Sequence, residues 1–183
     1  MGGHSTLPPG KSLLPSINFF TFVRMEPTNP TLYQWAGGEA ALQNLFRVFY
    51  DKVLQDDLIG PVFRQMSADH PRHVADFVAE VFGGPKKYTG EDCGSHATMI
   101  AHHIGKMLDE PKRKRWMQLL LDTADEIGLP ADPEFRSALV GYLEWGSRIA
   151  VLNSQVTENP VTDTEPMPRW DWGVPGGPYQ PKT

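Results

Sequence analysis

Apolar residues recur every three to four positions through most of the middle of the chain. In the segment 39–55 the spacing i, i+3, i+4, i+7, i+11 places five apolar side chains on one helical face. These are Leu42, Leu45, Phe46, Phe49 and Val53. The alternating pattern of a half-buried strand is nearly missing. The hydrophobic pattern therefore predicts an all-α domain.

Capping residues and glycine or proline breaks divide this region into about six helices, one of them short. Thr31 and Asp69 are expected to cap the first and third helices, and Asp109 and Asp132 the last two. The predicted helices cover residues 31–36, 39–55, 70–82, 96–108, 110–128 and 133–153. Residues 57–66 are expected to form a short apolar turn, and residues 86–95 a loop.

Composition changes at both ends of the chain. Residues 1–28 are rich in Gly and Pro and show no helical period, so we expect a disordered N-terminal extension. The C-terminal tail, residues 156–183, contains six prolines. Its aromatic residues Trp170, Trp172 and Tyr179 are possible anchors on the domain. One folded domain, residues 29–155, is expected between the two tails.

Charge and cysteine content limit the classes of partner. The formal net charge of −5 argues against binding to nucleic acid or to an anionic membrane, and the basic run 112–115 is interpreted as a solvated helix face. No apolar stretch has the length of a membrane span. The single cysteine, Cys93, excludes an intramolecular disulfide and a cysteine-based zinc site. A cytoplasmic protein is therefore expected.

Two adjacent histidines differ in their predicted orientation. In a helix over 96–108, His103 shares one face with Met99 and Met107, whereas His102 points about a quarter-turn away, toward the polar side. A histidine on an apolar face is either a hydrogen-bonded core residue or a haem ligand. The pattern alone favours the core residue.

A second helix presents a histidine in the same way. His70, Val74 and Phe77 follow the spacing of one apolar stripe, and His73 lies on its flank. A flat apolar macrocycle would fill a space between this stripe and the one around His103, with polar groups at its rim.

Five motifs in a consistent order resemble those of the group II truncated haemoglobins. The similarity runs from about residue 31 to residue 155. Two of the motifs depend on a step of thirteen residues, from Tyr50 to Phe63 and from His103 to Trp116, a step that His102 does not match. The motifs are Val48-Phe49-Tyr50, Phe63, Phe82-Gly83-Gly84-Pro85 with Tyr88, His103 with Trp116, and the segment 143–153.

The resemblance implies a truncated globin fold, a two-over-two helical sandwich around haem b. It makes His103 the proximal iron ligand. It places the Tyr50 hydroxyl and the Trp116 indole N–H beside the ligand on the distal side, together with His70. The haem contacts that we infer from the stripes and the resemblance are Phe63, His73, Val74, Phe77, Tyr88, Met99, His102, Met107 and Trp116.

Two departures from the family pattern affect these expectations. Many members have a small residue where His70 stands, so this imidazole could donate to the ligand, bind the iron directly or point outward. Ile104-Gly105-Lys106 replaces the usual step after the proximal histidine. The groups that contact the haem propionates therefore stay open. Tyr88 and His73 rank first among the candidates, which also include His96, His102 and Lys106.

Three classes of function follow. The first is a globin with five-coordinate iron that binds O2, NO or CO, with a role in redox or detoxification chemistry instead of O2 transport. Up to three distal donors would slow ligand release. The second is a haem enzyme with peroxidase-like or NO dioxygenase activity, served by an unidentified reductase. The third is a non-haem metal-binding or interaction module. We expect a monomer or a homodimer.

Overall fold

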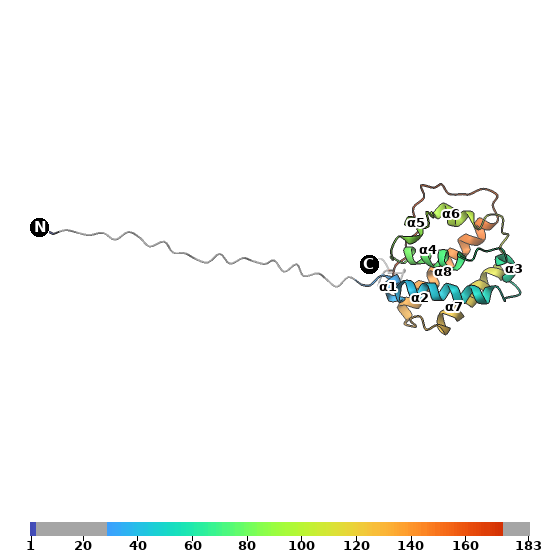
Figure 1. Ribbon diagram of the computed structural model, residues 1–183, viewed down its shortest axis with the longest axis horizontal. Coiled ribbons are helices and arrows are strands. Elements are labelled where there is room, and N and C mark those ends of the chain that lie inside the picture. The colour runs from blue at the N-terminus through green and yellow to red at the C-terminus, as the bar shows by residue number, and fades with distance from the viewer. Residues whose placement is uncertain (3–28, 174–183) are drawn as a thin grey trace, which may run out of the picture.

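The computed structural model describes residues 1–2 and 29–173, and within these residues it contains helices and no strands (Figure 1). The all-α prediction is therefore confirmed, with eight helices in the described range instead of about six. The helices are α1 (Leu32–Trp35), α2 (Gly38–Val53), α3 (Gly60–Phe63), α4 (His70–Val81), α5 (Lys87–Gly90), α6 (His96–Ala101), α7 (Glu110–Glu126) and α8 (Pro133–Ser154).

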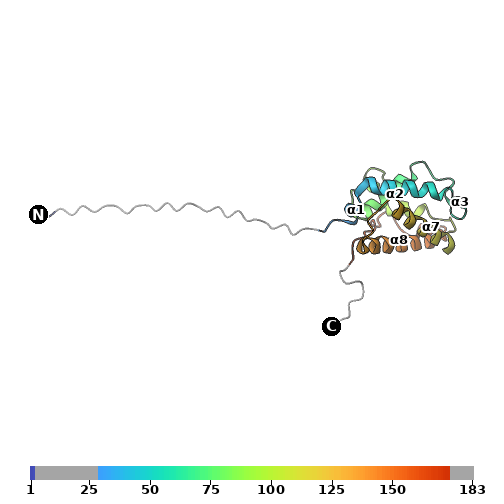
Figure 2. The same ribbon diagram turned by 90° about the horizontal axis from the view of Figure 1, so that it is seen from below.

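The four long helices form two layers. Helix α2 packs against α4 and α7, and α7 packs in turn against α8. Figure 2 shows α2 above α7 and α8. The apolar face predicted for 39–55 is the reason for this arrangement, because all five of its residues are buried. The two-over-two sandwich is thus built on a sequence pattern that requires burial on one side of α2.

The predicted caps mark the helix starts, with one exception. The Thr31, Asp109 and Asp132 side chains each accept a hydrogen bond from a backbone N–H in the first turn of their helix. Asp69 occupies the N-cap position of α4, but its side chain makes no capping hydrogen bond. Pro71 in the first turn of α4 lacks an N–H and lowers the number of donors to be satisfied there.

The expectation of a plain loop over 86–95 is wrong, because α5 lies within it. Long-range contacts stabilise this single turn. The Thr89 backbone N–H and hydroxyl donate to the two Glu80 carboxylate oxygens at 3.1 and 2.7 Å. The Tyr88 ring packs edge-on against Phe77, with a centroid distance of 5.2 Å. Contacts of this kind leave no periodic signal in the segment itself.

The helix expected over 96–108 ends much earlier, at Ala101. Residues 102–105 form a turn, and the backbone of Gly105 has a φ of +71°. A left-handed glycine ends a helix at no steric cost. Met107 follows with a φ of +50°, which is unusual for a residue with a side chain. The chain thereby turns away from the axis of α6 and enters α7.

The described part of the C-terminal tail packs on the domain. The Trp170 indole N–H donates to the Ala138 carbonyl at 3.0 Å, and the Trp172 indole N–H donates to the Pro30 carbonyl at 2.7 Å. Trp172 also meets Trp35 edge-on at a centroid distance of 5.6 Å. Two of the three expected aromatic anchors are thus in place. Tyr179 and the N-terminal extension (residues 3–28) lie outside the described residues.

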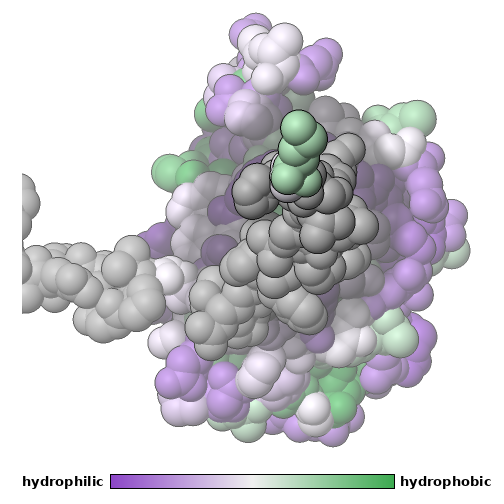
Figure 3. Space-filling view, turned by 90° about the vertical axis from the view of Figure 1, so that its left-hand side faces the viewer, coloured by the Kyte–Doolittle hydropathy of each residue, from purple (hydrophilic) through white to green (hydrophobic). Residues whose placement is uncertain are grey.

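The surface of the described domain is mixed in character. Around the grey atoms in Figure 3, hydrophilic residues make up most of the visible face, and hydrophobic residues are scattered among them. Over residues 1–2 and 29–173, no helix combines the length and the hydropathy that a membrane crossing requires.

Gly84 allows the close approach that ends α4 against α1. A Cβ at this position would lie 2.7 Å from the Ala79 carbonyl oxygen and 2.7 Å from the Tyr33 ring. We expect Gly84→Ala to lower the free energy of unfolding by about 2 kcal/mol, because backbone and a packed ring must both move. Gly90→Ala is the matched control, since a Cβ there meets nothing within 4 Å. Equal urea midpoints for the two variants would contradict this account.

Candidate functional site

His103 is held in one tautomer by the carbonyl of Met99, a residue of the preceding helix α6. Its Nδ1 lies 2.9 Å from the Met99 carbonyl oxygen, which can only accept, so Nδ1 carries the proton and donates. The lone pair of Nε2 is then free to bind a metal. Burial is the largest cause that lowers the pKa of His103 below its usual value. A half-buried, neutral imidazole with one committed nitrogen is what a haem iron requires.

The expected difference between the two adjacent histidines is present, although for another reason. His103 is half-buried, whereas His102 is exposed. Both follow the last residue of α6, so the helical phase of a longer helix does not set their directions. The turn itself orients them, with the His103 backbone N–H donating to the Ile100 carbonyl at 2.9 Å.

Tyr50, Phe63 and His70 form a cluster between α2, α3 and the start of α4. The ring centroids of Tyr50 and His70 lie 4.8 Å apart, those of Tyr50 and Phe63 5.4 Å, and those of Phe63 and His70 6.1 Å. Tyr50 is 3% exposed, and burial raises the pKa of its hydroxyl well above its usual value. The hydroxyl therefore stays protonated and is available as a donor.

Trp116 joins this cluster through Phe49. The Phe49 ring packs edge-on against Trp116 at 5.4 Å and against Tyr50 at 4.9 Å. Trp116 projects from α7 and Tyr50 from α2, so the pair depends on the packing of these two helices. Phe49 therefore links Trp116 of α7 to Tyr50 of α2, and Tyr50 in turn contacts His70 of α4.

The polar atoms of this cluster lack partners in the described chain. His70 Nε2 is buried and has no hydrogen-bond partner there. The Tyr50 hydroxyl and the Trp116 indole N–H also make no hydrogen bond to a described residue. By contrast, the indoles of Trp35, Trp170 and Trp172 all donate. A buried polar group is normally paired, so the unpartnered His70 Nε2 beside Tyr50 indicates a place for a ligand.

The His70 imidazole is neutral over the physiological range. Burial lowers its pKa from 6.5 to about 4, and repulsion from His102, His103 and His73 acts in the same direction. These imidazoles therefore lie within electrostatic range of one another. One nitrogen of a neutral His70 carries a proton, and this nitrogen can donate to a ligand.

His73, about one turn along α4 from His70, lies in a charged network. Its Nε2 is 2.8 Å from an Arg72 guanidinium nitrogen and 3.7 Å from an Asp92 carboxylate oxygen. Arg72 also bridges Asp92 and the buried Asp76 at 3.0 Å each. Burial raises the pKa of Asp76, and the Arg72 charge opposes this shift. The expected role of His73 at the haem rim stays a prediction, with the Arg72 guanidinium beside it.

The remaining predicted contacts differ in burial. Phe77 and Tyr88 are buried, and Val74 and Met99 are partly buried against the core. The Tyr88 hydroxyl is 3.5 Å from the Ser95 carbonyl, and burial raises its pKa to about 12. Met107 is 63% exposed, which contradicts its placement on a helical face with His103. The early end of α6 is the physical reason.

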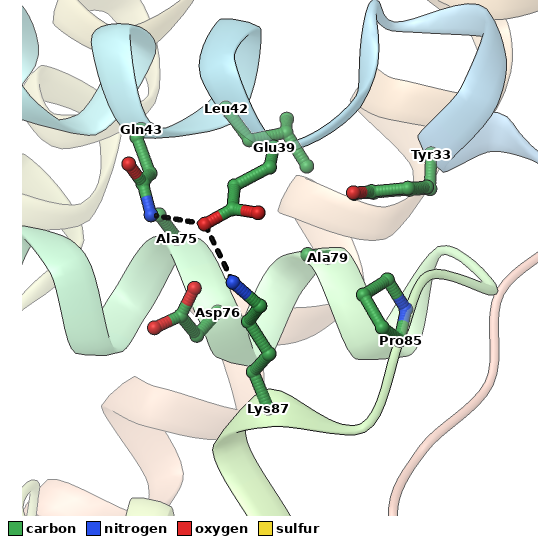
Figure 4. A pocket seen from close by; sticks show the side chains of 9 residues that line it. All are labelled: Tyr33, Glu39, Leu42, Gln43, Ala75, Asp76, Ala79, Pro85 and Lys87. Carbon is green, nitrogen blue, oxygen red and sulfur yellow. Dashed lines mark hydrogen bonds and ion pairs between the residues drawn. The ribbon is translucent and has the colours of Figure 1, made fainter. Parts of the chain in front are cut away.

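A small pocket that does not involve these residues lies between α2, α4 and α5. Its volume is about 10 Å³, which is room for one water molecule. Lys87 donates to Glu39 at 2.7 Å across its mouth, and Gln43 donates to the same carboxylate at 3.0 Å (Figure 4). It is too small for an organic ligand. Within the described range, moreover, no three His, Cys, Asp or Glu side chains meet to hold a metal ion.

Comparison with known proteins gives a consistent family. The model of the bacterial-like globins matches residues 31–144, more than half of the chain. Group 2 truncated hemoglobin YjbI of Bacillus subtilis is 28% identical over 121 residues, which is 66% of this chain and 89% of that protein. A group 1 truncated hemoglobin of Tetrahymena thermophila is 30% identical over 101 residues, or 55% of this chain and 78% of that protein.

Solved structures agree with this result. The truncated oxygen-avid haemoglobin from Bacillus subtilis superposes with a TM-score of 0.59 at 29% identity, covering 67% of this chain and 99% of that one. A thermostable hemoglobin from Thermobifida fusca gives 0.59 at 26% identity, covering 70% and 100%. The group II truncated hemoglobin from Bacillus anthracis shares the fold, with 0.61 at 22% identity over 68% and 92%.

The chain therefore belongs to the bacterial-like globin family. The resemblance to group II truncated haemoglobins and the truncated globin fold are confirmed, and haem b is the cofactor of this class. The residues present fit that cofactor, because His103 offers a free Nε2 and His70 leaves a buried Nε2 without a partner.

Some residues that shape the site carry no signal in the sequence. Arg72 and Asp92 flank His73, yet they are separated by twenty positions and follow no motif. Ser154, Gln155 and Asn159 contact the segment around His103 from the far end of the chain. The bond to the Met99 carbonyl is different, because an acceptor four residues before His103 could be anticipated from the helix expected over 96–108.

His70 makes the stability of the haem-free protein depend on pH. Its folded pKa of about 4 lies below the unfolded value of 6.5, so the unfolded state binds more protons between these values. Stability is therefore fully present above about pH 6.5 and falls as the pH drops toward 4. We expect His70→Gln to lose less stability than the parent protein between pH 7 and 4.5, in urea unfolding.

His103 contributes in the same direction in both proteins, because its pKa is also lowered. His102→Gln is a second variant and is expected to reduce the slope less than His70→Gln, because repulsion from His102 is only one of the causes that lower the pKa of His70. A parallel loss of stability in the parent protein and in His70→Gln would refute the buried, neutral state of His70.

Proposed function

We propose that the protein holds haem b through His103 as a five-coordinate iron and binds the diatomic ligands O2, NO and CO beside Tyr50, Trp116 and His70. One observation carries this proposal. The His103 imidazole, with Nδ1 already committed, occurs together with the His70 Nε2, which is buried and has no partner in the described chain. A purely structural core would satisfy such groups internally.

The residues of the proposed site have two roles, to hold the haem iron and to stabilise its ligand. The Met99 carbonyl keeps the His103 proton on Nδ1 and orients the ring. Haem supplies the iron to which a diatomic ligand binds. With haem in place, Tyr50, Trp116 and His70 would donate hydrogen bonds to that ligand. Each bond to a charged acceptor contributes about 1.5–3 kcal/mol, which slows ligand release and favours redox or detoxification chemistry over O2 transport.

His70 has two possible roles in this pocket. Its contacts with Tyr50 and Phe63 support donation to the ligand or gating of the pocket, because the ring packs inward on these aromatic side chains. Direct binding to iron in the ligand-free state is the second role. A neutral His70 suits both, since a protonated imidazole cannot be a metal ligand.

A haem enzyme is the second candidate function. The observation that favours it is an imidazole of low pKa beside a protonated tyrosine, since such a pair can accept and return a proton during cleavage of an O–O bond. Peroxide turnover with a one-electron donor tests the peroxidase-like reaction. Consumption of NO by the oxygenated protein, supplied with a reductase, tests the dioxygenase reaction.

The exposed, unpaired Cys93 supports a cytoplasmic location for the protein under both candidate functions.

Titration of haem into the purified haem-free protein tests the first proposal. We expect saturation at one haem per chain with a sharp Soret band. The ferrous, ligand-free spectrum separates the two roles of His70, because a five-coordinate spectrum supports donation and a six-coordinate spectrum supports ligation. Failure of the parent protein to take up haem would overturn the proposal.

A further inference from the structure

The segment that carries His103 is tied at its beginning to the C-terminal tail. Asn159 Nδ2 donates to the Ala97 carbonyl of α6 at 2.9 Å, across 62 positions of sequence. The Asn159 Oδ1 accepts from the Val161 backbone N–H at 3.2 Å. The Oδ1 of Asn159 is therefore fixed by the local turn, while its Nδ2 binds the backbone of α6. In Figure 1 the tail runs over α6 on its way back toward α1.

The same segment is tied at its other end to the last residues of α8. The Leu108 backbone N–H donates to Ser154 Oγ at 2.9 Å, and Gln155 Nε2 donates to the Leu108 carbonyl at 2.7 Å. The Met107 backbone N–H donates to the Ser154 carbonyl at 3.2 Å. Ser154 is fully buried, whereas the Gln155 bond lies at the surface.

Between these two ties the backbone has little support of its own. Helix α6 is only six residues long, and the turn after it contains two left-handed residues, Gly105 and Met107. Short helices are marginal without tertiary contacts. A left-handed residue with a side chain persists only where its surroundings fix it. His103 lies in this stretch, so its position depends on the two ties.

The far end of the tail is anchored independently. The Trp170 backbone N–H donates to the Val81 carbonyl at 3.0 Å, and its ring packs between Tyr142 and Trp145, each at a centroid distance of 5.9 Å. The tail is thus fixed both at Gln155 and at Trp170. Asn159, which lies between these points, is held over α6 and not on a free end.

We propose that Ser154, Gln155 and Asn159 form a proximal clamp, which positions His103 for the haem iron and slows haem loss. The inference rests on the proposed function, in which His103 binds that iron. The three residues are positioning residues, because they contact the backbone on both sides of His103 and not the cofactor itself.

Asn159→Asp tests the clamp with the smallest change of shape. Aspartate keeps the acceptor for the Val161 N–H and loses the donor to the Ala97 carbonyl. Asn44→Asp is the matched control, because Asn44 is exposed on α2 and far from the clamp in sequence. In the haem-free proteins, we expect amide exchange over 97–103 to be about three- to tenfold faster in Asn159→Asp, from the loss of one hydrogen bond.

The holoproteins provide two further measurements. We expect Asn159→Asp to release haem several times faster than Asn44→Asp and to shift the iron–histidine stretching frequency in the Raman spectrum. Exchange in α2 is expected to be unchanged in both variants. Ser154→Ala, which strands the Leu108 N–H, is expected to act over 104–108 in the same way.

The outcomes separate the clamp from the proposed function. Unchanged exchange over 97–108, or equal acceleration in α2, would overturn the clamp even where haem binds normally. If the parent protein takes up no haem, the proposed function fails, and with it the role in positioning His103 for iron. Faster exchange with an unchanged stretching frequency and haem-loss rate would reduce the clamp to a local stabilising contact and contradict the proposal.

Discussion

Replacing His103 with alanine is expected to abolish haem binding, whereas replacing His102 with alanine is expected to leave it intact. His103 is half-buried with Nδ1 bound to the Met99 carbonyl, and His102 is exposed. Loss of a partner behind a metal ligand already costs about 10- to 100-fold in affinity. Loss of the ligand itself should therefore weaken haem binding by roughly 100-fold or more, measured by titration at the Soret band.

Chemical rescue sharpens this test. In His103→Gly, added imidazole can take the place of the missing ring, and we expect it to restore the Soret band. His102→Gly with the same imidazole is the control and is expected to show no change. Equal haem affinity in the two alanine variants would refute the assignment of His103 as the ligand, and loss of haem in His102→Ala alone would reverse it.

The long helices could be predicted because their burial is one-sided. The apolar positions of α2 repeat with the helical period, and proline and capping aspartates mark the starts of α7 and α8. These signals involve residues that are close together in the chain, so they can be recognised in the sequence alone. The packing of α2 on α4 and α7 then follows from which faces are apolar.

The short elements could not be predicted in the same way. Helix α5 exists because Thr89 bonds to Glu80 and Tyr88 packs on Phe77, and neither contact leaves a period in residues 86–95. Residues 107 and 108 leave the expected helical path and donate their backbone N–H groups to Ser154. The extension of that helix to residue 108 was wrong for this reason, and it misplaced Met107.

The candidate site shows the same division. The inward direction expected for His103 was correct, although a turn and not a continuous helix produces it. The grouping of Tyr50, Trp116 and His70 could not be inferred from periodicity, because the three residues lie on different helices. Only the resemblance to a family linked them, and the packing around Phe49 and Phe63 explains the link physically.

Tyr50→Phe is expected to speed the release of O2 without lowering the stability of the haem-free protein. Loss of a hydrogen bond of about 1.5–3 kcal/mol should raise the dissociation rate of O2 by roughly tenfold to a hundredfold. The Tyr50 hydroxyl is buried and unpaired in the described chain, so its removal should leave the haem-free protein equally stable or more stable. Flash photolysis or stopped flow gives the rate, and urea unfolding gives the stability.

A faster release of O2 without a loss of stability is the result that separates a distal donor from a core tyrosine. A core tyrosine replaced by phenylalanine would alter stability and leave the dissociation rate unchanged, which would refute the role of Tyr50. Trp116→Phe is the companion variant, because its indole N–H is also unpartnered while its ring packs on Phe49. If both groups donate to one ligand, the double variant should depart from the product of the single effects, since donors that share an acceptor are coupled.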